Sequence, residues 1–250
     1  MSALRIYLLE AKFELYKTAR TPAFVVPTVL LPMAFYAFFG LAMQASPGAS
    51  LPLSLIATYA AFGSISTALF AFGVGFAMER SRGWLTLKRA TPMPLSALFA
   101  ARAVVSMVFA FLTTLGLVLL GVFFGGVHLS AAQVALLFVA ATVGALPFCA
   151  LGLFIGSLAK AEGAASVVNL VHLPLSLASG LWVPLRFLPK QIRAVAPLLP
   201  HYHFGQLTLA ALGLGDGGPV FVSALSLFAF GALFFAAARL AFARAEGHAA

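Results

Sequence analysis

Residues 78–94 read Met-Glu-Arg-Ser-Arg-Gly-Trp-Leu-Thr-Leu-Lys-Arg-Ala-Thr-Pro-Met-Pro and separate two long apolar stretches. The region from Glu79 to Arg102 holds six of the 21 charged side chains of the chain. More than 20 apolar-rich residues flank it on each side. Because charged side chains are costly inside a bilayer, we expect this stretch to lie outside the lipid, where it can contact a soluble partner.

The composition around this stretch is that of an integral membrane protein. Charged residues make up 8% of the chain and hydrophobic residues 62%, and the mean hydropathy is +1.06. A soluble domain carries about 25% charged residues. The net charge of +9 is distributed over the ends of apolar segments, which indicates control of membrane topology and no nucleic-acid partner. The single cysteine, Cys149, excludes a disulfide framework and a cysteine-based metal site.

The apolar runs predict an all-α fold with six transmembrane helices, since a spanning helix needs about 20 mainly apolar residues. The run around Gly125-Gly126 is far too long for one span, and this pair supplies a turn that divides it. The six predicted spans are residues 23–43, 53–77, 98–124, 131–157, 164–183 and 219–240.

Two further segments do not fit the pattern of a span. Residues 3–20 carry a narrow apolar stripe (Leu4, Leu8, Ala11, Leu15) and predict an interfacial helix on the cytoplasmic leaflet. A soluble N-terminal helix is the less favoured alternative, because Pro22 and the first span follow at once. The segment 184–218 contains four prolines and only short apolar pieces, which are typical of short re-entrant helices between spans five and six.

The positions of lysine and arginine predict the orientation. Twelve of them lie in the N-terminal segment, the 78–102 region, the fourth connection and the C-terminal end, whereas three lie in 184–218. Under the positive-inside rule, both termini and the charged stretch are therefore cytoplasmic. Arg102 and Arg239 lie about one turn inside their spans, and we expect both side chains to snorkel to the interface.

The sequence offers no energy source of its own. No lysine follows a glycine as a nucleotide-binding loop requires, and the predicted spans contain no carboxylate for ion coupling. We therefore predict no catalytic, cofactor-binding or metal-binding residues and no enzymatic activity. A stand-alone ion-coupled carrier or channel stays open as an alternative. His201-Tyr202-His203 lacks a third metal ligand nearby, and these residues are interpreted as interfacial anchors.

The fifth predicted span has the clearest polar stripe, with side chains spaced by three or four residues on one helix face. These residues indicate either the wall of a substrate path or helix–helix contacts in the bundle or a dimer interface. The stripe consists of Ser166, Asn169, His172, Ser176 and Ser179. Two glycine pairs, Gly121/Gly125 and Gly152/Gly156, similarly favour close helix contacts.

Three stretches together resemble the permease subunit of ABC-2 type exporters. The first runs from the predicted interfacial helix through Arg20-Thr21-Pro22 into the first span. The second, Glu79 to Leu85 followed by Arg89-Ala90-Thr91-Pro92, is similar to the family's acidic-basic-Gly motif and its Thr-Pro pair. The third, Ser179 to Pro184 with the downstream Leu199-Pro200-His201-Tyr202, resembles the family's Ser-Gly-x-x-x-Pro and Pro-Tyr pattern.

This resemblance implies a single domain over 1–250, with an interfacial helix (1–21), a six-helix bundle (22–240) and a cytoplasmic tail (241–250). It implies an exporter of a hydrophobic or amphipathic solute, such as a drug or lipid, in the bacterial inner membrane. It further implies a second permease copy, identical or not, and a separate ATPase subunit that docks on the 79–94 loop.

The composition of that loop is itself that of an interface, with an aromatic residue among arginines. A solvated basic loop near anionic lipid is the alternative, but it gives no reason for Trp84. The predicted coupling residues are Glu79, Arg80, Arg82, Gly83, Trp84, Leu85, Leu87, Lys88 and Arg89.

Overall fold

The computed structural model describes residues 3–42, 51–84, 94–215 and 218–247. The regular structure in these ranges is all helical and includes no strand. Five helices in them are long and apolar enough to cross a bilayer, which confirms the predicted all-α membrane fold. The five candidate spans are Pro22–Ala42, Leu51–Ser81, Ser96–Phe124, Ala131–Leu158 and Val220–Ala241.

Proline and glycine interrupt several of these spans without ending them. Proline has no N–H to donate and its ring crowds the preceding turn, so a helix around it widens locally into π-type turns. In the first span, α2 and α3 alternate with two such turns near Pro27 and Pro32. The elements are α2 (Pro22–Val25), a π turn (Val26–Leu30), α3 (Leu31–Phe35) and a second π turn (Tyr36–Ala42).

The other spans differ in whether their helix is interrupted. The second joins α4 and α5 through a π turn, the third is one unbroken helix, and the fourth bends between α8 and α9, where Pro147 begins the second half. Their bounds are α4 (Leu51–Leu69), the π turn (Phe70–Val74), α5 (Gly75–Ser81), α7 (Leu95–Phe124), α8 (Ala131–Val143), α9 (Leu146–Leu158) and α13 (Val220–Gly247).

The predicted span 164–183 is shorter in the structure than expected. Helix α10 (Ala164–Ala178) has 15 residues, which is about 22 Å at 1.5 Å per residue against about 30 Å of hydrocarbon. It ends at Ala178, and the turn beyond it contains Gly180, whose φ of +78° suits glycine, with Leu181 N–H donating to the Ser176 carbonyl at 3.0 Å. The count of six spans is therefore not confirmed, and five helices of spanning length are found in the described part of the chain.

Short helices follow α10, in the segment that the sequence assigned to re-entrant pieces. Two 3-10 turns, Leu185–Phe187 and Ala196–Leu198, flank α11 (Lys190–Val195), and α12 (Pro200–Ala211) comes next. α12 packs against α4 and α13. That these pieces dip into the outer leaflet stays a prediction.

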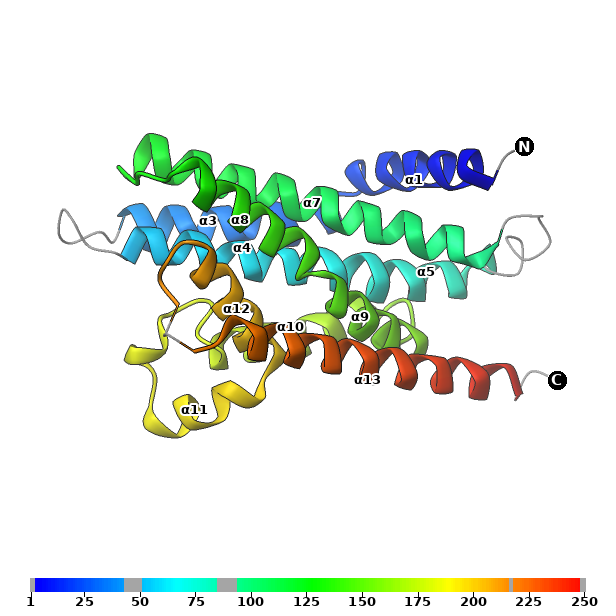
Figure 1. The fold of residues 1–250 in the computed structure, drawn as a ribbon. Coiled ribbons are helices and arrows are strands. Elements are labelled where there is room, and N and C mark those ends of the chain that lie inside the picture. The colour runs from blue at the N-terminus through cyan, green and yellow to red at the C-terminus, as the bar shows by residue number, and fades with distance from the viewer. Residues whose placement is uncertain (1–2, 43–50, 85–93, 216–217, 248–250) are drawn as a thin grey trace.

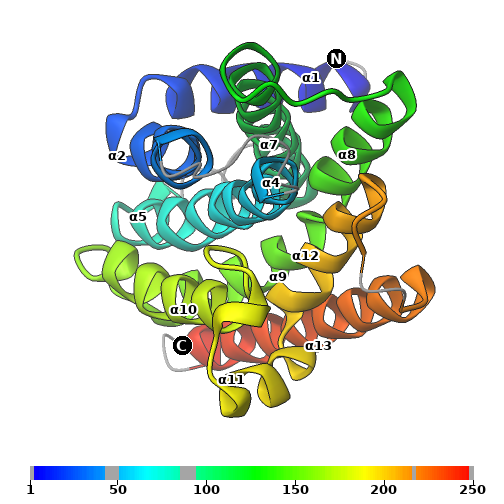
Figure 2. The same cartoon turned by 90° about the vertical axis from the view of Figure 1, so that its left-hand side faces the viewer.

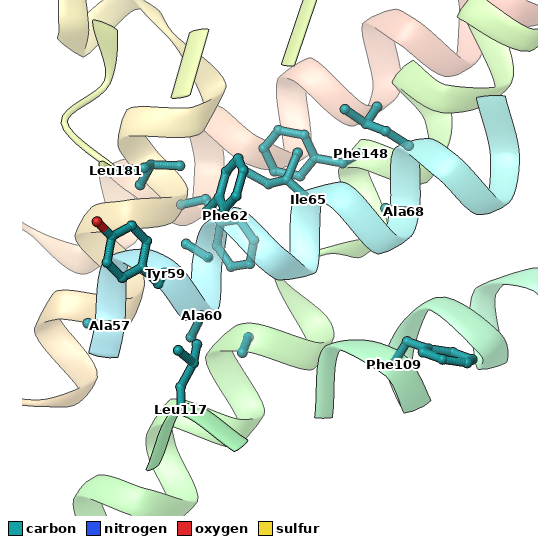
Figure 3. Close-up of a cluster of buried hydrophobic side chains, with 14 of the residues drawn as sticks. Ala57, Tyr59, Ala60, Phe62, Ile65, Ala68, Phe109, Leu117, Phe148 and Leu181 are labelled. Carbon is teal, nitrogen blue, oxygen red and sulfur yellow. The ribbon is translucent and has the colours of Figure 1, made fainter. Parts of the chain in front are cut away.

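Helix α4 lies at the centre of the molecule. Figure 2 shows it surrounded by neighbouring helices, and residues 55–73 are all buried. A helix that is hydrophobic all round is expected to be a core helix. In Figure 3, Leu181 and Phe148 lie on one side of α4, and Leu117 and Phe109 lie on the other.

The Gly152/Gly156 pair makes its close contact within this chain. A Cβ atom on Gly156 would lie 2.6 Å from the Gly73 carbonyl oxygen and 2.8 Å from that of Phe72. A Cβ on Gly152 would lie 3.0 Å from the Phe72 Cβ. The two glycines thus let α9 approach the π turn that joins α4 to α5, as small residues do at membrane helix contacts.

The N-terminal helix α1 (Ala3–Ala19) packs against α7 (Figures 1 and 2), and of its leucine stripe only Leu15 is packed against the core. Glu14 and Thr18 are buried there, and the Tyr7 hydroxyl lies 2.8 Å from Ser96 Oγ. Leu4 and Leu8 are more than 60% exposed. Leu4 and Leu8 are therefore free to face lipid, and the position of α1 on the leaflet stays a prediction.

Both termini lie at one end of the molecule, and α11 lies at the other (Figure 1). The last turn of α5, at Ser81, is at the end where the termini lie. We call this the terminal end and its opposite the α11 end. The arrangement brings Glu79, at the start of the 79–94 loop, to α1, where it pairs with Lys17.

Candidate functional site

Four charged side chains form a cluster at the terminal end, in which Arg102, Glu14 and Glu79 are largely buried and Lys17 is half-exposed. Arg102 of α7 is 0% exposed, and its Nη2 atom lies 2.6 Å from Glu79 Oε2. Its Nε atom lies 3.4 Å from Glu14 Oε1 on α1. Lys17 Nζ lies 2.7 Å from Glu79 Oε1 and also pairs with Glu14. The cluster (Glu14, Lys17, Glu79, Arg102) is electrically neutral and joins three helices.

Burial explains why these charges are paired. An isolated ion in a low-dielectric interior pays a desolvation cost of several kcal/mol, which opposite charges offset only in good geometry. The guanidinium of Arg102 and the ammonium of Lys17 each contact both carboxylates, and Arg102 does so through two different nitrogens of its planar group. Its Cζ atom also lies 5.8 Å from the centre of the Phe76 ring, within the range of a cation–π contact.

Arg80 ties the same turn of α5 to a further helix. Its Nη2 atom donates to the Ala159 carbonyl at 2.8 Å, and its Nη1 atom donates to the Ser157 carbonyl. These carbonyls lie at the C-terminus of α9, where the last groups of a helix lack intrahelical donors and the helix dipole favours a cation. Adjacent residues of α5 thus bind α1 and α7 on one side and α9 on the other.

The turn continues into an exposed tip. Trp84 is 51% exposed, although a large aromatic side chain is usually buried. Gly83 has a φ of +71°, and no atom lies within 4 Å of the point that a Cβ would occupy there, so neighbouring groups do not restrict this turn. The predicted coupling residues Leu85, Leu87, Lys88 and Arg89 lie outside the described residues.

The polar stripe of α10 does not face a single environment. Ser166 is exposed and Asn169 is half-buried, whereas His172, Ser176 and Ser179 are buried. His172 Nε2 lies 2.7 Å from Ser66 Oγ of α4, and its Nδ1 atom lies 3.2 Å from Ser176 Oγ. The ring also stacks on Phe62 at 4.7 Å. In this conformation the buried half of the stripe forms contacts inside one chain.

His201 completes this buried group, and its interpretation as an interfacial anchor is wrong. It is 0% exposed, and its Nε2 atom lies 3.2 Å from His172 Nδ1. His203 is also buried, with Nδ1 3.3 Å from Ser223 Oγ of α13. The helix start at Pro200 places both histidines inward, because they lie on the side of α12 that packs against its neighbours.

The charged cluster itself is not apparent from the sequence. The sequence predicts that the Arg102 side chain snorkels to the interface. In the structure this side chain is buried and paired with two glutamates. Glu14 and Lys17 belong to the polar side of the predicted interfacial helix, and of the four residues only Glu79 is a predicted site residue. The sequence feature that could have indicated the cluster is the small number of charged residues in the chain. A buried charge needs a partner of opposite charge, and the predicted topology offers Arg102 few of them.

Comparisons with known proteins identify the family of the chain. The family described as "ABC-2 type transporter" matches residues 8–212. The chain is also similar to the protein named "Putative transport permease YvfS" of Bacillus subtilis (strain 168). The two are 29% identical over 224 residues, which cover 88% of this chain and 90% of the relative. The match to the family extends from α1 to the end of α12 and so includes the charged cluster and the histidine group. The chain belongs to the ABC-2 type transporter family.

Proposed function

We propose that this chain is the transmembrane subunit of an ATP-driven exporter and that a separate ATPase subunit acts on it through residues 79–94. The observation that carries the proposal is the double anchorage of the α5 end. Glu79 is ion-paired with Arg102 and Lys17, and Arg80 is hydrogen-bonded to the end of α9. The half-exposed Trp84 follows directly beyond these anchors.

The anchors supply a path for mechanical force. A displacement applied at Trp84 reaches α7 and α1 through Glu79, and it reaches α9 through Arg80. Packed helices respond to such a displacement by moving as rigid elements. Exposed aromatic side chains near arginine, such as Trp84 near Arg82, are the residue types that anchor protein–protein interfaces. ATP binding by the partner would therefore move several helices together.

The charge pattern supports a cytoplasmic position for this end. Both termini and the last turn of α5 lie at the terminal end (Figure 1), and the sequence segments at these places carry most of the lysine and arginine residues. Arg186, Lys190 and Arg193 belong to the segment near α11. The positive-inside rule then places the terminal end in the cytoplasm and the α11 end outside, in the bacterial inner membrane.

The apolar exterior supports a complex of two permease copies and an amphipathic or hydrophobic solute, such as a drug or lipid. Large apolar side chains are exposed on α8, α10 and α13, including Leu136, Leu170 and Phe228. Lipid or a second copy can cover such faces. Ser166 and Asn169, on the accessible half of the α10 stripe, are proposed to line the path or the contact between copies.

Shortening the exposed tip tests the coupling proposal. Deletion of residues 84–88 should abolish co-purification of the ATPase and the stimulation of ATP hydrolysis, because the docking side chains are lost while the anchors Glu79 and Arg80 remain. Membrane insertion should be unchanged. Phe187→Ala, which removes an exposed aromatic ring at the α11 end, is the matched control and should retain both properties. Undiminished ATPase binding by the deletion variant would refute the coupling role.

A second measurement separates this proposal from a stand-alone carrier or channel. The purified chain is reconstituted into liposomes with and without the ATPase and ATP. We expect solute flux only when both are present, since the chain has no nucleotide-binding loop. Flux through the chain alone would favour the carrier.

A further inference from the structure

A polar cavity opens at the α11 end, on the side opposite the charged cluster. It has a volume of about 240 Å³ and lies between α4, the turn after α10, and α12. Sites for drug-sized ligands usually measure about 300–1,000 Å³. The cavity is therefore too small for a whole amphipathic molecule, but it has room for a compact headgroup. Its polar lining consists of Ser54, Thr58, Ser179, Arg186, Tyr202 and Gln206.

The cavity contains a buried hydroxyl with no hydrogen-bond partner. Ser179 is 4% exposed, and its Oγ atom makes no hydrogen bond to the described protein. Such a group usually finds a partner, because leaving it unsatisfied costs free energy. The turn fixes its position: Gly180 N–H donates to the Leu177 carbonyl at 3.1 Å and Leu181 N–H to the Ser176 carbonyl at 3.0 Å, which closes α10 directly at Ser179.

The charge at the cavity is positive. Among the described residues that line it, Arg186 is the single charged side chain, and the other polar groups are hydroxyls and an amide. Arg186 is exposed at the rim, where its Cζ atom lies 4.9 Å from the ring of Phe187. Guanidinium and hydroxyl donors together are suited to a phosphate or carboxylate group.

The segment that follows the rim residue Arg186 in the sequence is typical of a membrane interface. Phe187, Val195 and Leu198 are 64%, 52% and 71% exposed, and Lys190 and Arg193 lie among them in the sequence. Apolar side chains interleaved with basic ones are characteristic of segments at headgroup depth. A ligand with an anionic headgroup and an apolar tail can therefore leave its tail in lipid while its headgroup enters the cavity.

We propose that this cavity binds the anionic headgroup of an amphipathic molecule, with Arg186 as the cation at the rim and Ser179 as the buried hydroxyl donor. The anion can be a phosphate or a carboxylate, which these donors recognise in the same way. That the bound molecule is the exported solute rests on the proposed function. The binding itself does not, because it requires neither the ATPase nor ATP.

Tryptophan fluorescence of the purified full-length chain in neutral detergent tests the site. The chain has two tryptophans, so Trp84→Phe leaves only Trp182, next to the lining residue Leu181. Three probes are titrated into this chain: dodecyl phosphate, dodecyltrimethylammonium with the same tail and opposite charge, and inorganic phosphate without a tail. We expect saturable binding of dodecyl phosphate, at least about tenfold tighter than either other probe.

Side-chain changes locate the bound anion. Arg186→Gln should weaken dodecyl phosphate binding by about tenfold, and Ser179→Ala should weaken it by about fivefold. Arg193→Gln is the matched control, because it removes the same charge from the same exposed segment outside the cavity. It should leave the affinity within about twofold.

Three results would overturn the assignment. Equal losses in Arg186→Gln and Arg193→Gln would indicate attraction by overall charge. Equal affinity for the ammonium probe would mean that the cavity does not select an anion. Equal affinity for inorganic phosphate would identify a site for free anions instead of a headgroup. A failure of ATPase coupling would leave these binding measurements unaffected, so the two proposals can fail separately.

Discussion

At the scale of single residues, the guanidinium of Arg102 is a buried charge held between two helices other than its own. It is fully buried, and Glu14 and Glu79 approach it from two different helices. Lys17 supplies the second positive charge that brings the cluster to neutrality. Replacing one partner of a buried ion pair leaves an uncompensated charge, and this costs more than the pair itself contributes.

We therefore expect Arg102→Met to lower the free energy of unfolding by about 3–5 kcal/mol, as measured by thermal unfolding in detergent. Arg239→Met is the matched control, because Arg239 lies about one turn inside its span but is exposed. This change should stay within about 0.5 kcal/mol. Adding Glu79→Gln to Arg102→Met should recover part of the loss. If Arg102→Met were as stable as Arg239→Met, the cluster would not hold the helices together.

At the scale of elements, the sequence predicted the long spans well and the short ones poorly. Continuous apolar runs divided by proline, glycine and charge place α7 and α13 without reference to the rest of the chain. The early end of α10 could not be predicted in this way. The residues that follow it, Ser179 to Val183, are as apolar as those of a transmembrane helix. Because hydropathy reports only how apolar a segment is, it does not distinguish a continuing helix from a turn that is buried against protein. Leu181, for example, is 1% exposed.

The site was only partly predictable for a related reason. The end of α5 could be found because its charges are conspicuous beside apolar runs. Its partners Glu14 and Arg102 come from helices that are distant in the sequence, and the angle at which α1 meets α7 is set by tertiary packing. His201 was misplaced for the same reason, since only the fold brings the start of α12 beside His172.

The contact between α9 and the second span gives a test at this scale. Gly156→Ala would place a Cβ atom 2.6 Å from the Gly73 carbonyl oxygen. Backbone on the opposing side cannot rotate away as a side chain can, so the helices must separate. Overpacking of this kind costs about 1–3 kcal/mol, and we expect a lower melting temperature in detergent. Gly163→Ala is the control, because no atom lies within 4 Å of its Cβ position. A Gly156→Ala variant as stable as this control would contradict the close contact.

At the scale of the whole molecule, the protein has two chemically different ends. The terminal end carries the buried ion cluster, the Arg80 anchor and the exposed Trp84. The α11 end carries the polar cavity with Arg186 at its rim. Helices of spanning length, including the central α4, connect the two. The proposed function assigns the ATPase to the terminal end and the solute to the α11 end, so we expect the two ends to face opposite sides of the membrane.

The sidedness of Trp84 tests this account most directly. Cysteine is introduced at position 84 or, as a reference for the opposite end, at position 193, in a chain whose buried Cys149 is replaced by alanine. A membrane-impermeant maleimide is then applied to intact cells and to inside-out vesicles. We predict that Trp84→Cys reacts only in inside-out vesicles and Arg193→Cys only in intact cells. Labelling of Trp84→Cys from outside intact cells would contradict the account, because no cytoplasmic ATPase could reach that surface.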